Sequence, residues 1–511
     1  MRRHVVIVGA GVTGLSAAWY LQRAAQERGI GVDCTLLEQK ARVGGKVWTR
    51  RVEHPRGTFL VEAGADSFLA HMKPWALELA TELDLDDRLI GTNDDARRVL
   101  VLRRGRLHAL PDGVFLIVPT KLWPFVRSGL LSPWGKLRTG CDLVLPRRRD
   151  PGDETLAEFV NRRLGHEVLD RIAEPLLSGI FNADAGRQSV LATLPRLRQM
   201  EVEHRSLILA ALRARRARKV TKLSASGDPS AAPSDGRGGG GAERDGRRAV
   251  QAAAGIRGSI FGSFLGGTEE LAERLRERID ARVELSSRAV DLRRAADGTL
   301  AVQVAACGKP ACGHGERTLC ADAVLLCAPA TETARLLDAI APEAARRVAS
   351  IRGVSTGSVS LGFDGTVVPP EALGFGLVIP SSERRPINAV TYSSVKLRGR
   401  APAGTSLLRV FFGGSRSPQT MMLDDEELVA VVRRQLRELL GVCSEPLFWQ
   451  IDRWPAAQPQ YDVGHLELVR AIEQGLPAGV WVAGSPFRGV GIPDCVRQGR
   501  DAAREVVDFL A

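Results

Sequence analysis

Three glycines near the amino terminus stand at a spacing that suits phosphate binding. Gly9, Gly11 and Gly14 directly follow the β-branched run at residues 5–8. In this pattern the first glycine turns the chain and the second lets backbone N–H groups approach a pyrophosphate. The third lets the next helix pack on the sheet. The positive end of that helix, expected at residues 15–27, would face the phosphates. These residues predict a dinucleotide site.

Two later features indicate which dinucleotide is bound. Glu38 ends a second apolar strand, expected at residues 34–37, where its carboxylate would accept hydrogen bonds from ribose hydroxyls and repel a 2′-phosphate. A second glycine pair follows in the segment RVGGK, residues 42–46. Two-dinucleotide flavoproteins resemble this segment closely, with Arg42 as a counter-charge to the diphosphate. FAD is therefore favoured over NAD.

Length and charge limit the remaining classes. The chain has 511 residues, enough for two or three lobes. Its net charge is +12, from 71 basic and 59 acidic residues, but the basic residues are spread along the chain with few aromatics between them. This pattern argues against nucleic acid and favours anionic small molecules or an anionic membrane surface.

The termini and cysteines indicate a cytoplasmic protein. The chain enters its first strand within a few residues, which leaves no room for a signal peptide, and it contains no apolar run of bilayer length. Eight cysteines, mostly single, fit reduced thiols. Cys307, Cys312, Cys320 and His314 lack a C-x-x-C pair, so a polar hairpin is favoured over zinc and no metal is expected.

The middle of the chain allows two interpretations. Residues 112–146 mix Trp123, Phe125 and Trp134 with lysines and arginines. Such a surface suits peripheral contact with a membrane or an amphipathic substrate, whereas the same apolar faces could form the core of a helical lobe. One long helix is expected at residues 194–219, and another at 268–279 with Thr268 as its cap. Residues 223–255 lose all apolar periodicity and predict a disordered insertion.

The carboxyl-terminal half predicts a sheet and a closing βα unit. Alternating segments at 359–363, 376–380, 387–393 and 407–413 indicate an antiparallel sheet over the cofactor. A buried strand at 480–484, a glycine-rich turn and a helix at 496–510 end the chain. The turn would present backbone amides to the flavin ring.

Four motifs together are far more specific than the dinucleotide pattern. They are EPLLSGIF at 174–181, EHRSLIL at 203–209, PQYDVGHLE at 459–467 and GVGIPDC at 489–495. With them the chain resembles the oxygen-dependent FAD porphyrinogen oxidases of the flavin amine oxidase superfamily. The similarity covers nearly the whole chain except residues 223–255 and the cysteine-bearing hairpin.

The resemblance implies a discontinuous Rossmann-like α/β FAD domain, a substrate domain with a mixed antiparallel sheet, and a helical lobe. The FAD domain would comprise residues 1–95, 256–345 and 451–511, the lobe 96–222 and the substrate sheet 346–450. Substrate would contact Arg98, Gly179 and Ile180. FAD would contact Gly9, Gly11, Thr13, Gly14, Glu38, Arg42, Gly45, Lys46, Gly64, Ala65, Asp66, Ser67, Val290, Trp454, Val490, Gly491 and Ile492.

The implied activity is oxidation of a porphyrinogen to the porphyrin by dioxygen in haem biosynthesis, with release of hydrogen peroxide. The residues at 118–121 and in GVGIPDC are more similar to those of the coproporphyrinogen-type enzymes, so coproporphyrinogen III is slightly favoured over protoporphyrinogen IX. No acid or base residue is assigned. A flavin amine oxidase or carotenoid desaturase shares the first and last segments, and a Rab-escort-like binding protein shares the fold without flavin. A homodimer and peripheral contact with the inner face of the cytoplasmic membrane are compatible with these features.

Overall fold

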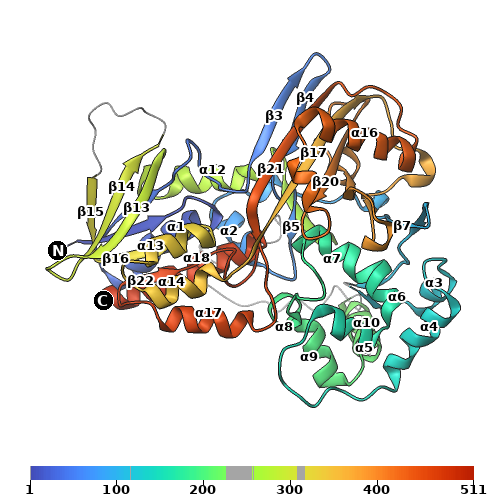
Figure 1. The fold of residues 1–511 in the computed structure, drawn as a ribbon, viewed down its shortest axis with the longest axis horizontal. Coiled ribbons are helices and arrows are strands. Elements are labelled where there is room, and N and C mark those ends of the chain that lie inside the picture. The colour runs from blue at the N-terminus through green and yellow to red at the C-terminus, as the bar shows by residue number, and fades with distance from the viewer. Residues whose placement is uncertain (1, 116, 226–255, 257, 308–316) are drawn as a thin grey trace, which may run out of the picture.

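The computed structural model describes residues 2–115, 117–225, 256, 258–307 and 317–511. Its centre is a five-stranded parallel sheet built from distant parts of the chain (Figure 1). The sheet contains, in spatial order, β12 (Arg282–Glu284), β2 (Val32–Leu37), β1 (Arg3–Val8), β16 (Ala323–Leu326) and β22 (Val480–Val482). The Rossmann-like domain is thus discontinuous in sequence, as predicted.

Alternate residues of β1 point into two separate cores. Val5 and Ile7 pack against helices on one face, and Val6 and Val8 pack on the other face. A β-branched run buried on both sides is what a central parallel strand requires. The first face carries α1 (Val12–Arg28), α2 (Trp75–Glu82), α12 (Glu269–Arg278) and α18 (Ile492–Leu510). The second carries α13 (Ala330–Leu337), α14 (Pro342–Ala349), α17 (His465–Gln474) and the antiparallel sheet of β13 (Ser287–Arg294), β14 (Leu300–Ala306) and β15 (Arg317–Ala321).

The substrate domain is a seven-stranded mixed sheet. One face packs on α16 (Asp425–Leu440), and Val101 and Val378 on the other face join the core of the helical lobe. The β7–β18 pair is parallel and the other neighbours are antiparallel. The strands, in order, are β21 (Phe448–Pro459), β17 (Gly353–Asp364), β20 (Thr405–Gly413), β19 (Ile387–Tyr392), β18 (Gly376–Val378), β7 (Val99–Arg103) and β8 (Arg106–Ala109).

Shorter strands connect these units. β3 (Thr49–His54) and β4 (Gly57–Glu62) form a ribbon beside the substrate sheet (Figure 1), and a short helix, α15 (Ser393–Lys396), follows β19. β11 (Phe261–Phe264) pairs with β5 (Phe68–Leu69) and β6 (Leu89–Gly91). Three strands of the substrate sheet fall in segments that were predicted to belong to other domains, and one of them is β21, most of which lies inside 451–511. β7 and β8 fall inside 96–222, yet their backbones extend the sheet through β18.

The helical lobe lies at the other end of the molecule from the parallel sheet (Figure 1). It contains β9 (Val114–Phe115), β10 (Val118–Pro119), α3 (Leu122–Arg127), α4 (Pro133–Gly140), α5 (Leu156–Arg163), α6 (His166–Val168), α7 (Glu174–Phe181), α8 (Val190–Thr193), α9 (Pro195–His204) and α10 (Leu207–Ala225). The prediction of a single helix at 194–219 is wrong, because two helices, α9 and α10, occupy this segment. Arg205 takes a left-handed conformation, with φ of 65°, and separates α9 from α10.

Two further expectations meet the structure differently. Thr268 precedes α12, but its side chain does not cap the helix. Its hydroxyl lies within hydrogen-bond distance of two acceptors instead, Glu62 and the carbonyl of Ala65. The insertion at 223–255 begins inside α10 and otherwise lies outside the described residues, as do Cys312 and His314. β14 and β15, the strands before and after the predicted cysteine-bearing hairpin, pair with each other. Within the described ranges, no cluster of histidine, cysteine and carboxylate side chains could hold a metal ion.

Candidate FAD site

Segments from four parts of the chain meet beyond the carboxyl end of β1. The residue 42–46 loop lies on the 9–14 loop, where the Gly44 N–H donates to the Ala10 carbonyl at 2.8 Å. Lys46 reaches the carboxyl-terminal part of the chain, where its ammonium contacts the Ser485 hydroxyl at 3.1 Å and the carbonyl of Ala457. The predicted halves of the dinucleotide site are therefore adjacent in space.

The glycines of the first loop are required by close backbone contacts. A Cβ on Gly14 would lie 2.0 Å from the carbonyl oxygen of Gly9, and a Cβ on Gly9 would lie 2.7 Å from the carbonyl oxygen of Cys327. Gly11 is different, since its Cβ would meet no atom closer than Gly45 Cα at 4.0 Å. This open side is where a ligand could approach the backbone. Among the described residues no side chain caps α1, so its first N–H groups face the same opening.

The charged residues predicted for this loop have structural partners as well. Both carboxylate oxygens of Glu38 accept backbone N–H groups, from Ala10 at 3.0 Å and Lys40 at 2.9 Å. The Arg42 guanidinium donates to carbonyls of its own loop, including Gly45 at 2.7 Å, and stacks on Trp48. Arg42 thus shapes the second loop, a role that the counter-charge interpretation did not include.

In the turn at residues 63–67, most backbone carbonyls are hydrogen-bonded within the described part of the chain, whereas most backbone N–H groups are not. Each carbonyl from Ala63 to Asp66 accepts a side-chain donor, supplied by Arg409, Trp454, Thr268 and Ser263. The N–H groups of residues 64–67 donate to no other residue that the structure describes. Since backbone amides in folded proteins are normally paired, a row of free N–H groups suits a ligand with acceptor atoms. A flavin ring edge carries such acceptors.

Side chains of the substrate sheet and its connections hold this turn in place. Lys396 donates to both carboxylate oxygens of Asp66 at 2.8 Å, and Arg409 contacts the carbonyls of Gly64 and Ala63 at 2.7 and 3.1 Å. Burial would raise the pKa of Asp66, but Lys396 and Arg409 outweigh it and lower the pKa below its ordinary value. Sequence reasoning missed Lys396 and Arg409. An arginine inside the otherwise apolar strand β20 was the available signal.

The carboxyl-terminal turn completes the site. α18 begins at Ile492 with Gly491 as its N-cap, and no described side chain caps it. Its first N–H groups, which follow Val490 and Gly491, are therefore available to a ligand. Val290 lies at a bulge of β13. That strand is joined to Glu38 by the Ser287 N–H, at 2.8 Å from the Glu38 carbonyl.

The predicted substrate residues belong to other elements than the segments of the candidate FAD site, which we call the cradle. Arg98 is exposed and directly precedes β7, and its carbonyl accepts the N–H of Phe375, the residue before β18, at 2.7 Å. Gly179 and Ile180 belong to α7, but their side chains lie outside what the structure describes. The EPLLSGIF motif is anchored at its first residue, since Ser381 donates to Glu174 at 2.8 Å. This contact fixes α7 against the loop after β18.

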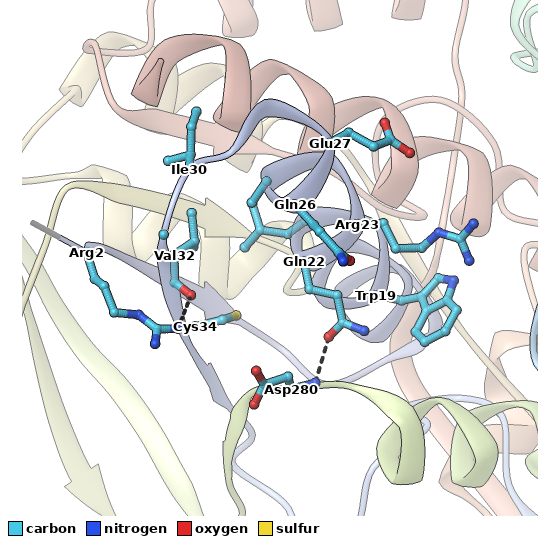
Figure 2. A pocket seen from close by; sticks show the side chains of 13 residues that line it. Arg2, Trp19, Gln22, Arg23, Gln26, Glu27, Ile30, Val32, Cys34 and Asp280 are labelled. Atoms are coloured by element: carbon cyan, nitrogen blue, oxygen red, sulfur yellow. Dashed lines mark hydrogen bonds between the residues drawn. The ribbon is translucent and has the colours of Figure 1, made fainter.

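A separate surface pocket lies on the far half of α1 (Figure 2). It is lined by Trp19, Gln22 and Cys34, with Asp280 at its rim, whereas the phosphate-facing end of α1 is at Gly11. One hydrogen bond crosses it, from the Asp280 N–H to the Gln22 side chain at 2.6 Å. The pocket therefore plays no part in the dinucleotide site.

Comparison with known proteins agrees with this geometry. The flavin containing amine oxidoreductase family matches residues 12–507. The chain is 38% identical to the coproporphyrinogen III oxidase of Propionibacterium freudenreichii subsp. freudenreichii, over 99% of this chain and 91% of that protein. It is 32% identical to the coproporphyrinogen III oxidase of Bacillus subtilis (strain 168), over 100% and 99%, and 30% identical to the protoporphyrinogen oxidase of Bos taurus, over 99% of each.

Solved structures give the same answer. The "Putative protoporphyrinogen oxidase" from Exiguobacterium sp. 255-15 superposes with a TM-score of 0.78 at 27% identity, covering 99% of both chains. Putrescine oxidase shares the fold, with a TM-score of 0.66 at 15% identity and 99% coverage of both chains. Fold and site thus define an FAD-dependent oxidoreductase. The chain belongs to the flavin containing amine oxidoreductase family and, within it, to the oxygen-dependent porphyrinogen oxidases.

Proposed function

We propose that this enzyme oxidises coproporphyrinogen III to coproporphyrin III in haem biosynthesis, using FAD and dioxygen and releasing hydrogen peroxide. The observation that carries the proposal is the split site, in which the 42–46 loop joins three segments. It contacts Ala10 before α1 and Ser485 before α18, and a Cβ on Gly64 of the turn with free amides would lie 1.9 Å from the Lys46 carbonyl oxygen. Similarity over the whole chain to coproporphyrinogen III oxidases supports this substrate. Protoporphyrinogen IX is the alternative substrate.

In porphyrinogen oxidation, the main task of the protein is to position the substrate. Bound FAD would supply an acceptor for two electrons that dioxygen can reoxidise. We assign the predicted cofactor-contacting residues to its binding. α7 and the substrate-sheet strand β18 would form the wall that holds the macrocycle against the cradle. Arg98, which directly precedes β7, is our candidate for a propionate contact.

Side-by-side turnover of both porphyrinogens, followed by porphyrin fluorescence, tests this proposal. Coproporphyrinogen III carries more carboxylates, so we expect its kcat/KM to be about tenfold higher. A preference for protoporphyrinogen IX would support the alternative substrate. Inertness towards both, from a protein that retains FAD, would reject the proposal.

We also propose that the enzyme acts in the cytoplasm and that α3, α4 and the turn after them contact an anionic membrane. No described helix combines the length and apolarity needed to cross a bilayer. Trp123 and Trp134 are 64% and 77% exposed, and Val144 is 73% exposed. The acidic residue between positions 121 and 149, Asp142, is buried against Arg163, so basic side chains set the charge of this surface. Apolar anchors with cationic flanks suit the interface of anionic lipids.

Vesicle binding tests the membrane contact. Replacing Trp123 and Trp134 by serine should weaken binding to phosphatidylglycerol vesicles by more than about tenfold, since two indole anchors are lost. Trp449→Ser is the matched control, because Trp449 is 43% exposed on β21, outside this surface. Equal binding by all three proteins, or equal binding to uncharged phosphatidylcholine vesicles, would contradict the proposal.

A further inference from the structure

Residues 484–489, which form most of the connection between β22 and α18, contain no helix or strand but are held by hydrogen bonds from other elements. This segment, the 484–489 loop, leads directly into the helix end that faces the candidate flavin site. Lys46 of the cradle also contacts it at Ser485. The loop therefore connects Lys46 of the candidate FAD site to the start of α18.

One phenolic oxygen closes this loop. The Tyr461 hydroxyl donates to the Ser485 carbonyl at 2.5 Å and accepts the Gly489 N–H at 2.9 Å. Tyr461 is only 3% exposed, and its ring stacks on His465 with centroids 4.1 Å apart. Because both hydrogen bonds use the same buried oxygen, the two ends of the loop are fixed relative to each other.

Two other side chains fix the rest of the loop. His465 Nε2 lies 2.8 Å from the Phe487 carbonyl, and since a carbonyl can only accept, this nitrogen carries the hydrogen. Burial lowers the pKa of His465, which favours its neutral form. Gln498 accepts the N–H groups of Gly484 and Arg488 at 3.2 Å each. The loop thus has three anchors. Two of them, Tyr461 and Gln498, bind Gly489, which is the anchored residue nearest to the start of α18.

We propose that Tyr461 is a positioning residue that holds residues 489–492 against the flavin ring and thereby raises the flavin reduction potential. The amino-terminal end of a helix carries a partial positive charge, which stabilises the negative charge that a flavin gains on reduction. Gly489 has φ of +123° and lies two residues before the N-cap, so loss of its hydrogen bond would let the helix end retreat. This inference rests on the proposed contact between Val490–Ile492 and FAD.

The three tyrosines of the chain provide a matched experiment. Tyr461→Phe removes one hydroxyl and keeps the ring that stacks on His465. Tyr392→Phe is the control, because Tyr392 is fully buried in β19 and its hydroxyl has no partner in the described part of the chain. The readouts are the FAD dissociation constant, the flavin absorbance spectrum and the flavin reduction potential, none of which needs a porphyrinogen.

We expect Tyr461→Phe to bind FAD about tenfold more weakly, the size of one lost buried hydrogen bond, and to show a more negative potential than wild type. Tyr392→Phe should match wild type in both. A Tyr461→Phe protein with wild-type FAD affinity, spectrum and potential would overturn the inference. If this variant cannot be recovered folded, Gln498→Met tests the same loop from α18, with the same expected shifts. Failure of porphyrinogen turnover in wild type would instead reject the proposed function.

Discussion

At the level of single residues, the 63–67 turn shows how charge holds the candidate flavin site together. Lys396 and Asp66 are each about 15% exposed, and the lysine bonds both carboxylate oxygens. Removing one partner leaves the other charge largely buried with less compensation. The pair therefore joins the substrate sheet to the turn that precedes β5.

This ion pair predicts a dependence of stability on pH. The pKa of Asp66 is lowered in the folded protein, so its contribution to stability is present above the unfolded value of about 3.9 and is lost as pH falls below it. We expect Asp66→Asn to be less stable by roughly 1–3 kcal/mol at pH 7 and to lose less further stability on acidification. Thermal unfolding of the FAD-bound proteins between pH 7 and pH 3 measures both effects.

The control for this prediction is an exposed ion pair. Arg56 and Asp364 are both more than half exposed, so Asp364→Asn should change stability little. Parallel acid-induced losses in wild type and Asp66→Asn would show that the Asp66 ion pair does not contribute as described.

At the level of elements, the position of α1 depends on Gly14, because the turn before the helix leaves no room for a side chain there. Gly14→Ala places a Cβ 2.0 Å from a backbone oxygen, which only a shift of α1 or of the 9–14 loop can relieve. We expect a loss of roughly 1–3 kcal/mol in stability and loss of most FAD binding. Differential scanning calorimetry and FAD titration measure the two effects.

Gly140, the last residue of α4, is the matched control. A Cβ there would meet no atom within 4 Å, so Gly140→Ala should be neutral or gain up to about 1 kcal/mol from helix propensity. If the two alanine variants bound FAD equally well, the close packing of Gly14 would not be needed for the site.

Sequence reasoning succeeded where one local pattern carried the information. Gly9, Gly11 and Gly14 defined the first turn because the contacts they permit lie within a few residues or on the adjacent strand. Arg409 and Tyr461 bind backbone that is distant in sequence, so no local pattern could pair them with their partners. The break at Arg205 was missed for a similar reason. Its left-handed backbone accompanies a carbonyl that Arg163 binds from α5.

At the level of the whole molecule, the site exists only when the two ends of the chain come together. β1 and β22 lie on either side of β16, and α1 packs against α18. Along the sequence, the substrate sheet and the helical lobe are inserted between these two ends (Figure 1). This order explains why the dinucleotide motif indicated a cofactor, while the later motifs indicated a substrate.

The most direct test of this account is the ratio of hydrogen peroxide to coproporphyrin III formed by the purified FAD-bound protein. Conversion of a porphyrinogen to a porphyrin removes six electrons in three two-electron steps, so we predict about three peroxides for each porphyrin and no turnover without dioxygen. A purified protein without flavin absorbance, or porphyrin formation at the rate of the uncatalysed reaction, would contradict the account.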